Sequence, residues 1–217
     1  MISNKCIDEI NDFMHKEDQL LIINRKSEND SDVFFEKLVQ FQFSTMGKVR
    51  KKFAKQGVQN ILKNKIPEIL RNDQFYEKWI ADMIKVIEVF CSFLKEDSVC
   101  FWLGSERGCK RYHVDLVPFR MLVTYAGKGT ELLPDETANR NAFINGEPNK
   151  KIVKSKSLIK FINKWDIAIF RGGKNGILHR TPDSASNGQS ILMRLDHPSF
   201  WEKVKDYQKK IEENLDR

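Results

Sequence analysis

The chain has 217 residues, enough for one well-buried core and too few for two independent enzyme domains. Hydrophobic residues make up 41% and charged residues 31%, a balance that excludes wholesale disorder. The net charge of +7 comes largely from lysine clusters, which more often form a solvated surface than a nucleic-acid site. Composition therefore predicts a single globular domain.

Membrane insertion and secretion find no support in the sequence. The apolar stretch 80–94 is interrupted by Asp82, Lys85 and Glu88, and no run approaches the roughly 20 apolar residues of a membrane span. The first 19 residues are polar and lack the apolar segment of a secretory signal. We therefore expect a cytoplasmic protein, in whose reducing compartment the four cysteines, which form no Cys-x-x-Cys pair, should be free thiols.

The N-terminal part, residues 1–97, predicts a mainly helical layer. Helical apolar spacing occurs over 36–43 and 58–70, with Pro67 as a break, and 75–95 is the strongest helix. In that last segment apolar residues recur every three or four positions, which gives one stripe that faces a core. A short apolar run at 20–24 is a candidate strand.

Residues 98–197 change to short β-type runs separated by turn residues. These runs cover 99–103, 111–114, 120–125, 166–170, 176–179 and 191–195. The pattern is typical of a sheet or barrel, and residues 198–217 predict a C-terminal helix over 199–214. We therefore expect a single α+β domain in which an N-terminal helical layer packs on a β-barrel core.

One long irregular stretch, 127–156, interrupts the β-type runs. It is longer than a structural connection requires, which makes it a candidate lid or substrate loop. Its polar, turn-rich composition offers few apolar anchors, so we expect it to border the pocket and to be more mobile than the barrel.

A candidate metal site begins with His113 and Asp115. On a strand these side chains would point to the same face, with Cα atoms about 6.6 Å apart, so both could reach one ion. Such a pair is more often a hydrogen-bonded structural pair. His179 ends another β-type run and can face the pair across a barrel, completing the two-histidine, one-carboxylate triad of non-haem Fe(II) oxygenases.

The order of these residues resembles the 2-oxoglutarate/Fe(II) dioxygenase superfamily. Its double-stranded β-helix carries His-x-Asp on an early strand, a distal histidine late in the barrel and a basic residue on the next strand. His113, Asp115, His179 and then Arg194 follow that order within 98–197. The resemblance implies a jelly-roll, cupin-like barrel and an oxygenase that uses Fe(II) and 2-oxoglutarate. Segments 113–134 and 179–182 also resemble an uncharacterised bacterial family of unknown function.

In the superfamily the distal basic residue pairs with the far carboxylate of 2-oxoglutarate, and Arg194 is the matching position. Arginine suits this role because its planar fork meets a carboxylate bidentately. Arg120 lies in a second apolar run and is another carboxylate-binding candidate, and Thr124 and Tyr125 could add hydroxyl contacts.

Other interpretations remain open at this point. Cys109 would share the face of the metal ligands on a regular strand, and a thiolate favours zinc, so the alternative is a non-catalytic, cupin-like protein that binds or senses zinc. A nucleic-acid-binding module rests on charge alone, so a small-molecule or peptide substrate is favoured over nucleic acid. The pattern explains neither Arg180 nor the oligomeric state.

Overall fold

The structure is a computed structural model that describes residues 2–27, 31–185, 190–202 and 204. Most of the expected C-terminal helix, 199–214, lies outside the described residues; within them, residues 200–202 and 204 are helical. None of the helices in the described ranges has the length and apolar character needed to cross a membrane.

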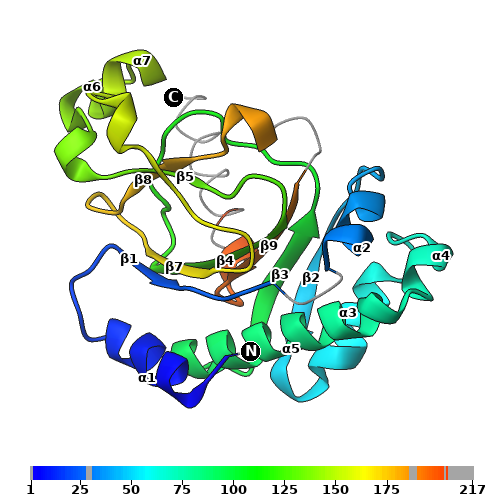
Figure 1. Ribbon diagram of the computed structural model, residues 1–217. Helices are drawn as coiled ribbons and strands as arrows, with labels where there is room; N and C mark the ends of the chain where they lie inside the picture. Colours follow the sequence, from blue (N-terminus) through cyan, green and yellow to red (C-terminus); the bar gives the residue numbers. More distant parts are fainter. Residues whose placement is uncertain (1, 28–30, 186–189, 203, 205–217) are drawn as a thin grey trace, which may run out of the picture.

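A six-stranded antiparallel sheet forms the centre of the fold, in the order β1-β7-β4-β9-β3-β2 (Figure 1). Its strands are β1 (Leu20–Ile23), β2 (Ser44–Arg50), β3 (Ser98–Gly104), β4 (Phe119–Ala126), β7 (Ile167–Arg171) and β9 (Ile191–Asp196). β1 and β2 come from the N-terminal layer and occupy the two edges.

A smaller antiparallel sheet has the order β6-β5-β8. Its strands are β5 (Glu131–Leu133), β6 (Lys160–Phe161) and β8 (Leu178–Arg180). A single bridge between His113 and His179 adds the 113 segment to the free side of β8. The expected strand over 111–114 is therefore reduced to one paired residue.

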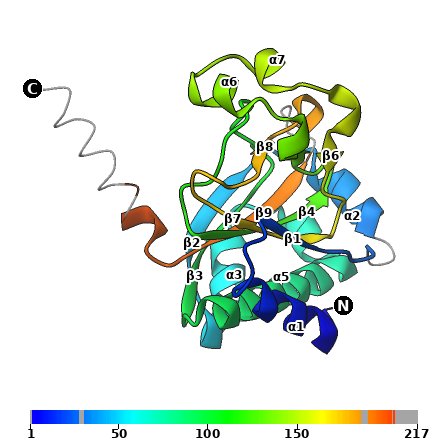
Figure 2. The same cartoon turned by 90° about the vertical axis from the view of Figure 1, so that its left-hand side faces the viewer.

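Helices cover the outer side of each sheet (Figures 1 and 2). Their bounds are α1 (Asn4–Phe13), α2 (Ser31–Leu38), α3 (Ala54–Leu62), α4 (Glu68–Arg71), α5 (Gln74–Leu94), α6 (Arg140–Ile144) and α7 (Asn149–Ile152). Short 3-10 turns lie at η1 (Lys51–Phe53), η2 (Asp135–Thr137), η3 (Lys156–Leu158) and η4 (Asp183–Ala185).

The long helix α5 supports the large sheet. Asp73 caps its start by accepting a hydrogen bond from the amide of Phe75, and Lys95 ends it in the left-handed conformation. Its buried stripe belongs to one core with the outward residues of β4, which are Met121, Val123 and Tyr125. Because side chains alternate along a strand, the even-numbered side chains of β4 point toward the small sheet.

The two sheets pack on each other through a small apolar layer. Leu122, Ala168 and Phe170 of the large sheet share this cluster with three residues on the small-sheet side: Leu132, Ile162 and Ile177. The layer fills only part of the space between the sheets, and the polar residues of the site occupy one end of it.

The α+β class with antiparallel sheets is confirmed, but the described strands form two separate sheets and no closed barrel. The stretch 127–156 also differs from expectation, because it contains β5, η2, α6 and α7. Leu133, Ala142 and Ile152 of this stretch pack with Tyr112 and Leu178 in a core of their own. Leu133 was among the few anchors expected, and Ala142 and Ile152 are further anchors that the expectation missed.

Candidate metal centre

Three side chains that the sequence singled out meet at the open end between the sheets. The ligand atoms of His113, Asp115 and His179 all lie within 4.8 Å of one another. The backbones of the two histidines exchange two hydrogen bonds of 3.0 Å, and their ring centroids are 4.4 Å apart. Phe170 packs against the His179 ring, with centroids 4.6 Å apart and the ring planes tilted by 47°. The bridge between two segments therefore fixes both imidazoles.

Both histidines present the same nitrogen to the site. The Nδ1 of His113 lies 3.0 Å from the carbonyl oxygen of Arg111, and the Nδ1 of His179 lies 3.0 Å from that of Ile177. A carbonyl oxygen can only accept, so each Nδ1 carries the proton and donates it. In a neutral imidazole this arrangement leaves a lone pair on Nε2, the form in which imidazole binds a metal ion.

The carboxylate of Asp115 completes a cluster that contains only acceptors. Its Oδ1 accepts a hydrogen bond from Arg120. Its Oδ2 is buried, lies 3.6 Å from the Nε2 of His179, and has no hydrogen-bond partner among the described residues. A buried oxygen without a donor is costly, and facing lone pairs repel each other. A cation held by the three side chains would remove both penalties, so this donor set fits a metal ion.

Arg120 supports the metal ligand from the large sheet. Its Nε donates to Asp196 at 2.7 Å while an Nη contacts Asp115, so one guanidinium bridges two buried carboxylates. Arg120 was predicted to bind a cosubstrate carboxylate. That role stays a prediction: Arg120 lines the cavity, and its guanidinium already offsets two carboxylates of the chain itself and orients Asp115.

A close backbone approach fixes the loop that carries Asp115. The amide of Gly173 donates to the carbonyl oxygen of Asp115 at 2.7 Å, and the amide of Gly172 donates to that of Pro118 at 3.0 Å. A Cβ built on Gly172 would lie 1.9 Å from the carbonyl oxygen of Val117, so only glycine fits there. The turn after β7 therefore holds the Asp115 loop in place.

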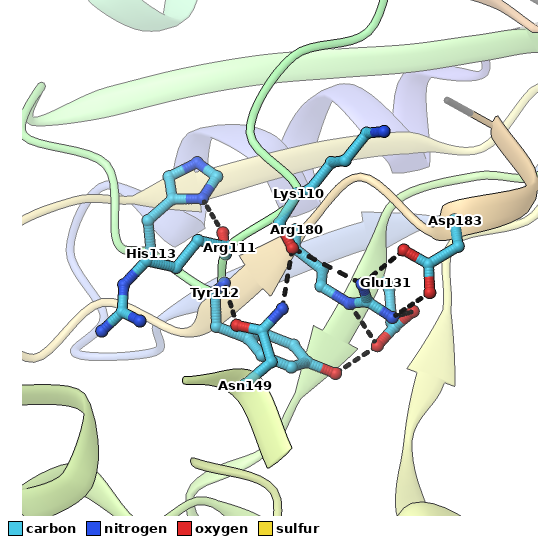
Figure 3. Close-up of polar contacts among 8 residues, drawn as sticks. All are labelled: Lys110, Arg111, Tyr112, His113, Glu131, Asn149, Arg180 and Asp183. Atoms are coloured by element: carbon cyan, nitrogen blue, oxygen red, sulfur yellow. Dashed lines mark hydrogen bonds and ion pairs between the residues drawn. The ribbon is translucent and has the colours of Figure 1, made fainter. Parts of the chain in front are cut away.

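The segment before His113 is held by a polar network (Figure 3). Asn149 accepts from the amide of Tyr112 at 3.0 Å and donates to the carbonyl oxygen of Lys110 at 2.8 Å. Arg180 pairs with Glu131, whose carboxylate also accepts from the Tyr112 hydroxyl. The role of Arg180, which the sequence did not explain, is thus to anchor this segment against β5.

Asn149→Ala is expected to weaken Mn²⁺ binding by about tenfold, because residues that position a metal ligand typically contribute 10–100-fold. The fold should survive, since Asn149 is a short-helix surface residue with two hydrogen bonds to one segment. Calorimetric titration with Mn²⁺ measures the change, and Asn145→Ala, at an exposed position, is the matched control. Equal affinities in the two variants would contradict the positioning role.

Burial lowers the pKa of His179 from 6.5 to about 4; the nearby Asp115 carboxylate acts in the opposite direction and does not offset it. The folded protein therefore keeps His179 neutral, whereas the unfolded chain protonates it below about pH 6.5. The free energy of unfolding should fall by about 3 kcal/mol as the pH drops from 6.5 to 4.

Chemical unfolding of the metal-free protein at several pH values tests this dependence. His179→Gln should flatten that part of the curve, while replacement of the exposed His15 should leave it unchanged. A wild-type curve with the same slope as that of His179→Gln would show that His179 does not titrate in this way.

A cavity of about 160 Å³ adjoins two of the three candidate ligands. Both histidines line it, together with Arg107, Arg194 and Trp102. The Nε of Arg194 lies 2.9 Å from Asp196 as an ion pair, although the atoms are not aligned for a hydrogen bond. The guanidinium of Arg194 also lies over the rings of Trp102 and Phe200, at 5.7 and 5.3 Å. The anionic partner expected for Arg194 is thus supplied by the chain.

Two further residues predicted to bind a cofactor lie away from this cavity. Tyr125 is fully buried on the opposite face of β4 and donates a hydrogen bond to Asp82 of α5 at 2.8 Å. That interpretation was wrong, since odd and even positions of a strand face opposite sides. Thr124 is buried on the correct side but is not among the residues that line the cavity.

Cys109 lines the cavity but does not belong to the group of three converging ligand atoms. It is an exposed free thiol in the loop before Tyr112, not a strand residue beside His113.

Sequence reasoning missed three buried polar residues of the site, Arg107, Thr130 and Asp196, since neither spacing nor a motif marks them.

Comparison with known families places the chain in the DUF1826 family of proteins of unknown function, whose model matches residues 4–196. The chain belongs to this family, which confirms its resemblance to an uncharacterised family. No curated protein matches the chain.

Several solved structures are similar to this chain, and their descriptions name dioxygenases or hydroxylases. A rice dioxygenase for auxin oxidation is 8% identical, with 89% of this chain and 79% of that chain covered and a TM-score of 0.43. TqaL, an Fe(II)/α-ketoglutarate-dependent dioxygenase, is also 8% identical, with 88% and 86% covered and a TM-score of 0.42. A Pseudomonas putida prolyl-4-hydroxylase is 8% identical, with 87% and 96% covered and a TM-score of 0.37. Likeness at this level does not establish a shared reaction.

Proposed function

We propose that this protein is an Fe(II)- and 2-oxoglutarate-dependent oxygenase. One observation carries the proposal. The ligand atoms of His113, Asp115 and His179 converge, and the buried carboxylate oxygen among them has no hydrogen-bond donor in the described residues. Two histidines and one carboxylate leave coordination positions open, and this is the ligand set of non-haem Fe(II) oxygenases.

The strand connections support a double-stranded β-helix. Along the chain, β3, β4, β7 and β9 belong to the large sheet, while the His113 segment, β5, β6 and β8 belong to the small one. Successive segments alternate between the two sheets except at the β5–β6 connection. A jelly roll is built from two facing sheets with such crossing connections.

In this proposal His113, Asp115 and His179 would hold Fe(II), which would supply the O2 chemistry for the oxidation of a substrate C–H bond. The reaction balances when 2-oxoglutarate loses CO2 to give succinate, with one oxygen atom of O2 in succinate and the other in the product. The Nδ1 of each histidine donates to a backbone carbonyl oxygen, which fixes the orientation of both rings, and Arg120 orients Asp115. Phe170 and the apolar layer exclude water from one side of the site. The substrate class we favour is a small molecule or peptide.

The second candidate function is a zinc-binding or zinc-sensing protein without oxygenase activity. Cys109 favours it, because an exposed thiol lines the same cavity as the three ligands and sulfur is a preferred zinc ligand.

Metal analysis after anaerobic purification, followed by a turnover assay, separates the two candidates. The oxygenase predicts bound iron and O2-dependent formation of succinate from 2-oxoglutarate, which is lost in Asp115→Ala. Tightly bound zinc, with neither 2-oxoglutarate binding nor succinate formation after reconstitution with Fe(II), would contradict the oxygenase and support the alternative.

A further inference from the structure

Arg107 is a buried cation in the cavity, and its surroundings differ from those of the other arginines there. Only 8% of the residue is exposed. One Nη donates to the carbonyl oxygen of Lys128 at 2.8 Å, and the other donates to the hydroxyl of Thr130 at 3.0 Å. Its Nε is buried and has no partner within the described part of the chain.

Every other arginine that lines the cavity has a carboxylate partner in the chain. Arg120 contacts Asp115 and Asp196, Arg180 contacts Glu131 and Asp183, and Arg194 contacts Asp196. No carboxylate of the described residues lies within 4.0 Å of Arg107. Both of its polar partners are neutral groups.

The electrostatic consequence is a charge that lacks its counterion. Burial alone lowers the pKa of Arg107 to about 10, so the guanidinium is still charged at neutral pH. Burial of a charge without a partner of opposite sign is costly, and it persists in native proteins mainly where a ligand supplies that partner. An anion in the cavity would supply it.

The position of Thr130 relates this charge to the metal site. In the small sheet Leu132 of β5 pairs with His179 of β8. Thr130 precedes Leu132 by two positions. Its Cα therefore lies about 6–7 Å from that of Leu132 along the chain direction, with its side chain on the same face of the sheet. His179, Thr130 and Arg107 all line the one cavity. A ligand that reaches from the metal to Arg107 must therefore be several atoms long and carry an anionic group at its far end.

We infer that Arg107, held by Thr130, binds the far carboxylate of a short dicarboxylate whose other end lies at the metal site. This inference rests on the proposed function and specifies it: Arg107, and not the sequence-predicted Arg194, anchors 2-oxoglutarate. Arginine meets a carboxylate through two parallel donors, and the free Nε is available as one of them. The cavity of about 160 Å³ suits a small ligand of this kind.

The test is a calorimetric comparison of three probes on full-length protein. 2-Oxoglutarate carries both the oxoacid end and the far carboxylate, 2-oxopentanoate lacks the far carboxylate, and glutarate lacks the oxo group. 2-Oxoglutarate is titrated into both the Mn²⁺-loaded and the metal-free protein, 2-oxopentanoate into the Mn²⁺-loaded protein, and glutarate into the metal-free protein. The variants are Arg107→Gln, Arg107→Lys and the matched control Arg194→Gln.

The wild type should bind 2-oxoglutarate at least tenfold more tightly than 2-oxopentanoate. Arg107→Gln should remove this preference and also remove glutarate binding, Arg107→Lys should recover part of both, and Arg194→Gln should keep both. Thermal unfolding of each variant verifies the fold. If Arg107→Gln does not fold, the comparison of Arg107→Lys with Arg194→Gln decides, because a loss confined to Arg194→Gln contradicts the inference.

The inference is overturned if the wild type binds neither glutarate nor 2-oxoglutarate, or if Arg107→Gln and Arg107→Lys both retain the wild-type preference. Failure of the proposed function gives a different result: glutarate binding still depends on Arg107, but Mn²⁺ does not strengthen the binding of 2-oxoglutarate. The two failures are therefore distinguishable in the same set of titrations.

Discussion

Asp115→Asn is expected to lower Mn²⁺ affinity by more than about 100-fold, because the change removes the only anionic ligand of the three converging side chains. The amide has nearly the same shape as the carboxylate, so the substitution leaves no cavity. The loss of Mn²⁺ affinity therefore reports the change in charge and ligand chemistry. Calorimetry or the electron paramagnetic resonance signal of free Mn²⁺ measures it.

Asp183→Asn is the matched control for this change. Asp183 is also paired with an arginine near the site, but its side chain is 78% exposed and it is not one of the converging ligands. It should bind Mn²⁺ as the wild type does. Similar affinities in Asp115→Asn and the wild type would remove the basis for the metal centre.

Arg120→Met is expected to destabilise the metal-free protein by about 3–5 kcal/mol, because it leaves two buried carboxylates without their shared cation. Asp115 and Asp196 are nearly inaccessible to solvent, with side chains 2% and 1% exposed. Urea unfolding measures the change. Saturating Mn²⁺ should recover part of the loss, since the ion neutralises Asp115.

Lys164→Met provides the comparison with an exposed ion pair. Lys164 contacts Asp32 at the surface, and its replacement should change the stability by no more than about 1 kcal/mol. A loss in Arg120→Met as small as that in Lys164→Met would show that Arg120 does not balance the two carboxylates.

The sequence located the three candidate metal ligands through an argument that was only partly correct. Strand parity placed His113 and Asp115 together, but the structure has one bridging residue there and no regular strand. The convergence depends instead on Asn149 and Gly172, which are distant in sequence. Residue types and order were therefore visible in the sequence, whereas the contacts that hold them were not.

Other features of the site depended on tertiary context. Strand parity could have separated Tyr125 from Arg120, because an odd and an even position of one strand cannot face the same cavity. Arg107 lies in a loop after β3, where no periodicity applies, and only the folded structure shows that it is buried with neutral partners and no carboxylate among the described residues. The short strands β5 and β6 contain three and two residues, too few to show an alternating pattern.

The distribution of the site over both sheets gives the bound ion a mechanical role. His179 belongs to the small sheet, while Arg120, which contacts Asp115, and Asp196, which pairs with Arg120, belong to the large one. An ion bound to this group would link the two sheets. At a thousand times its dissociation constant it would stabilise the folded state by about 4 kcal/mol. Amide hydrogen exchange in β4 and β8 should then slow together on metal loading, so the pair of strands would report occupancy even without a substrate.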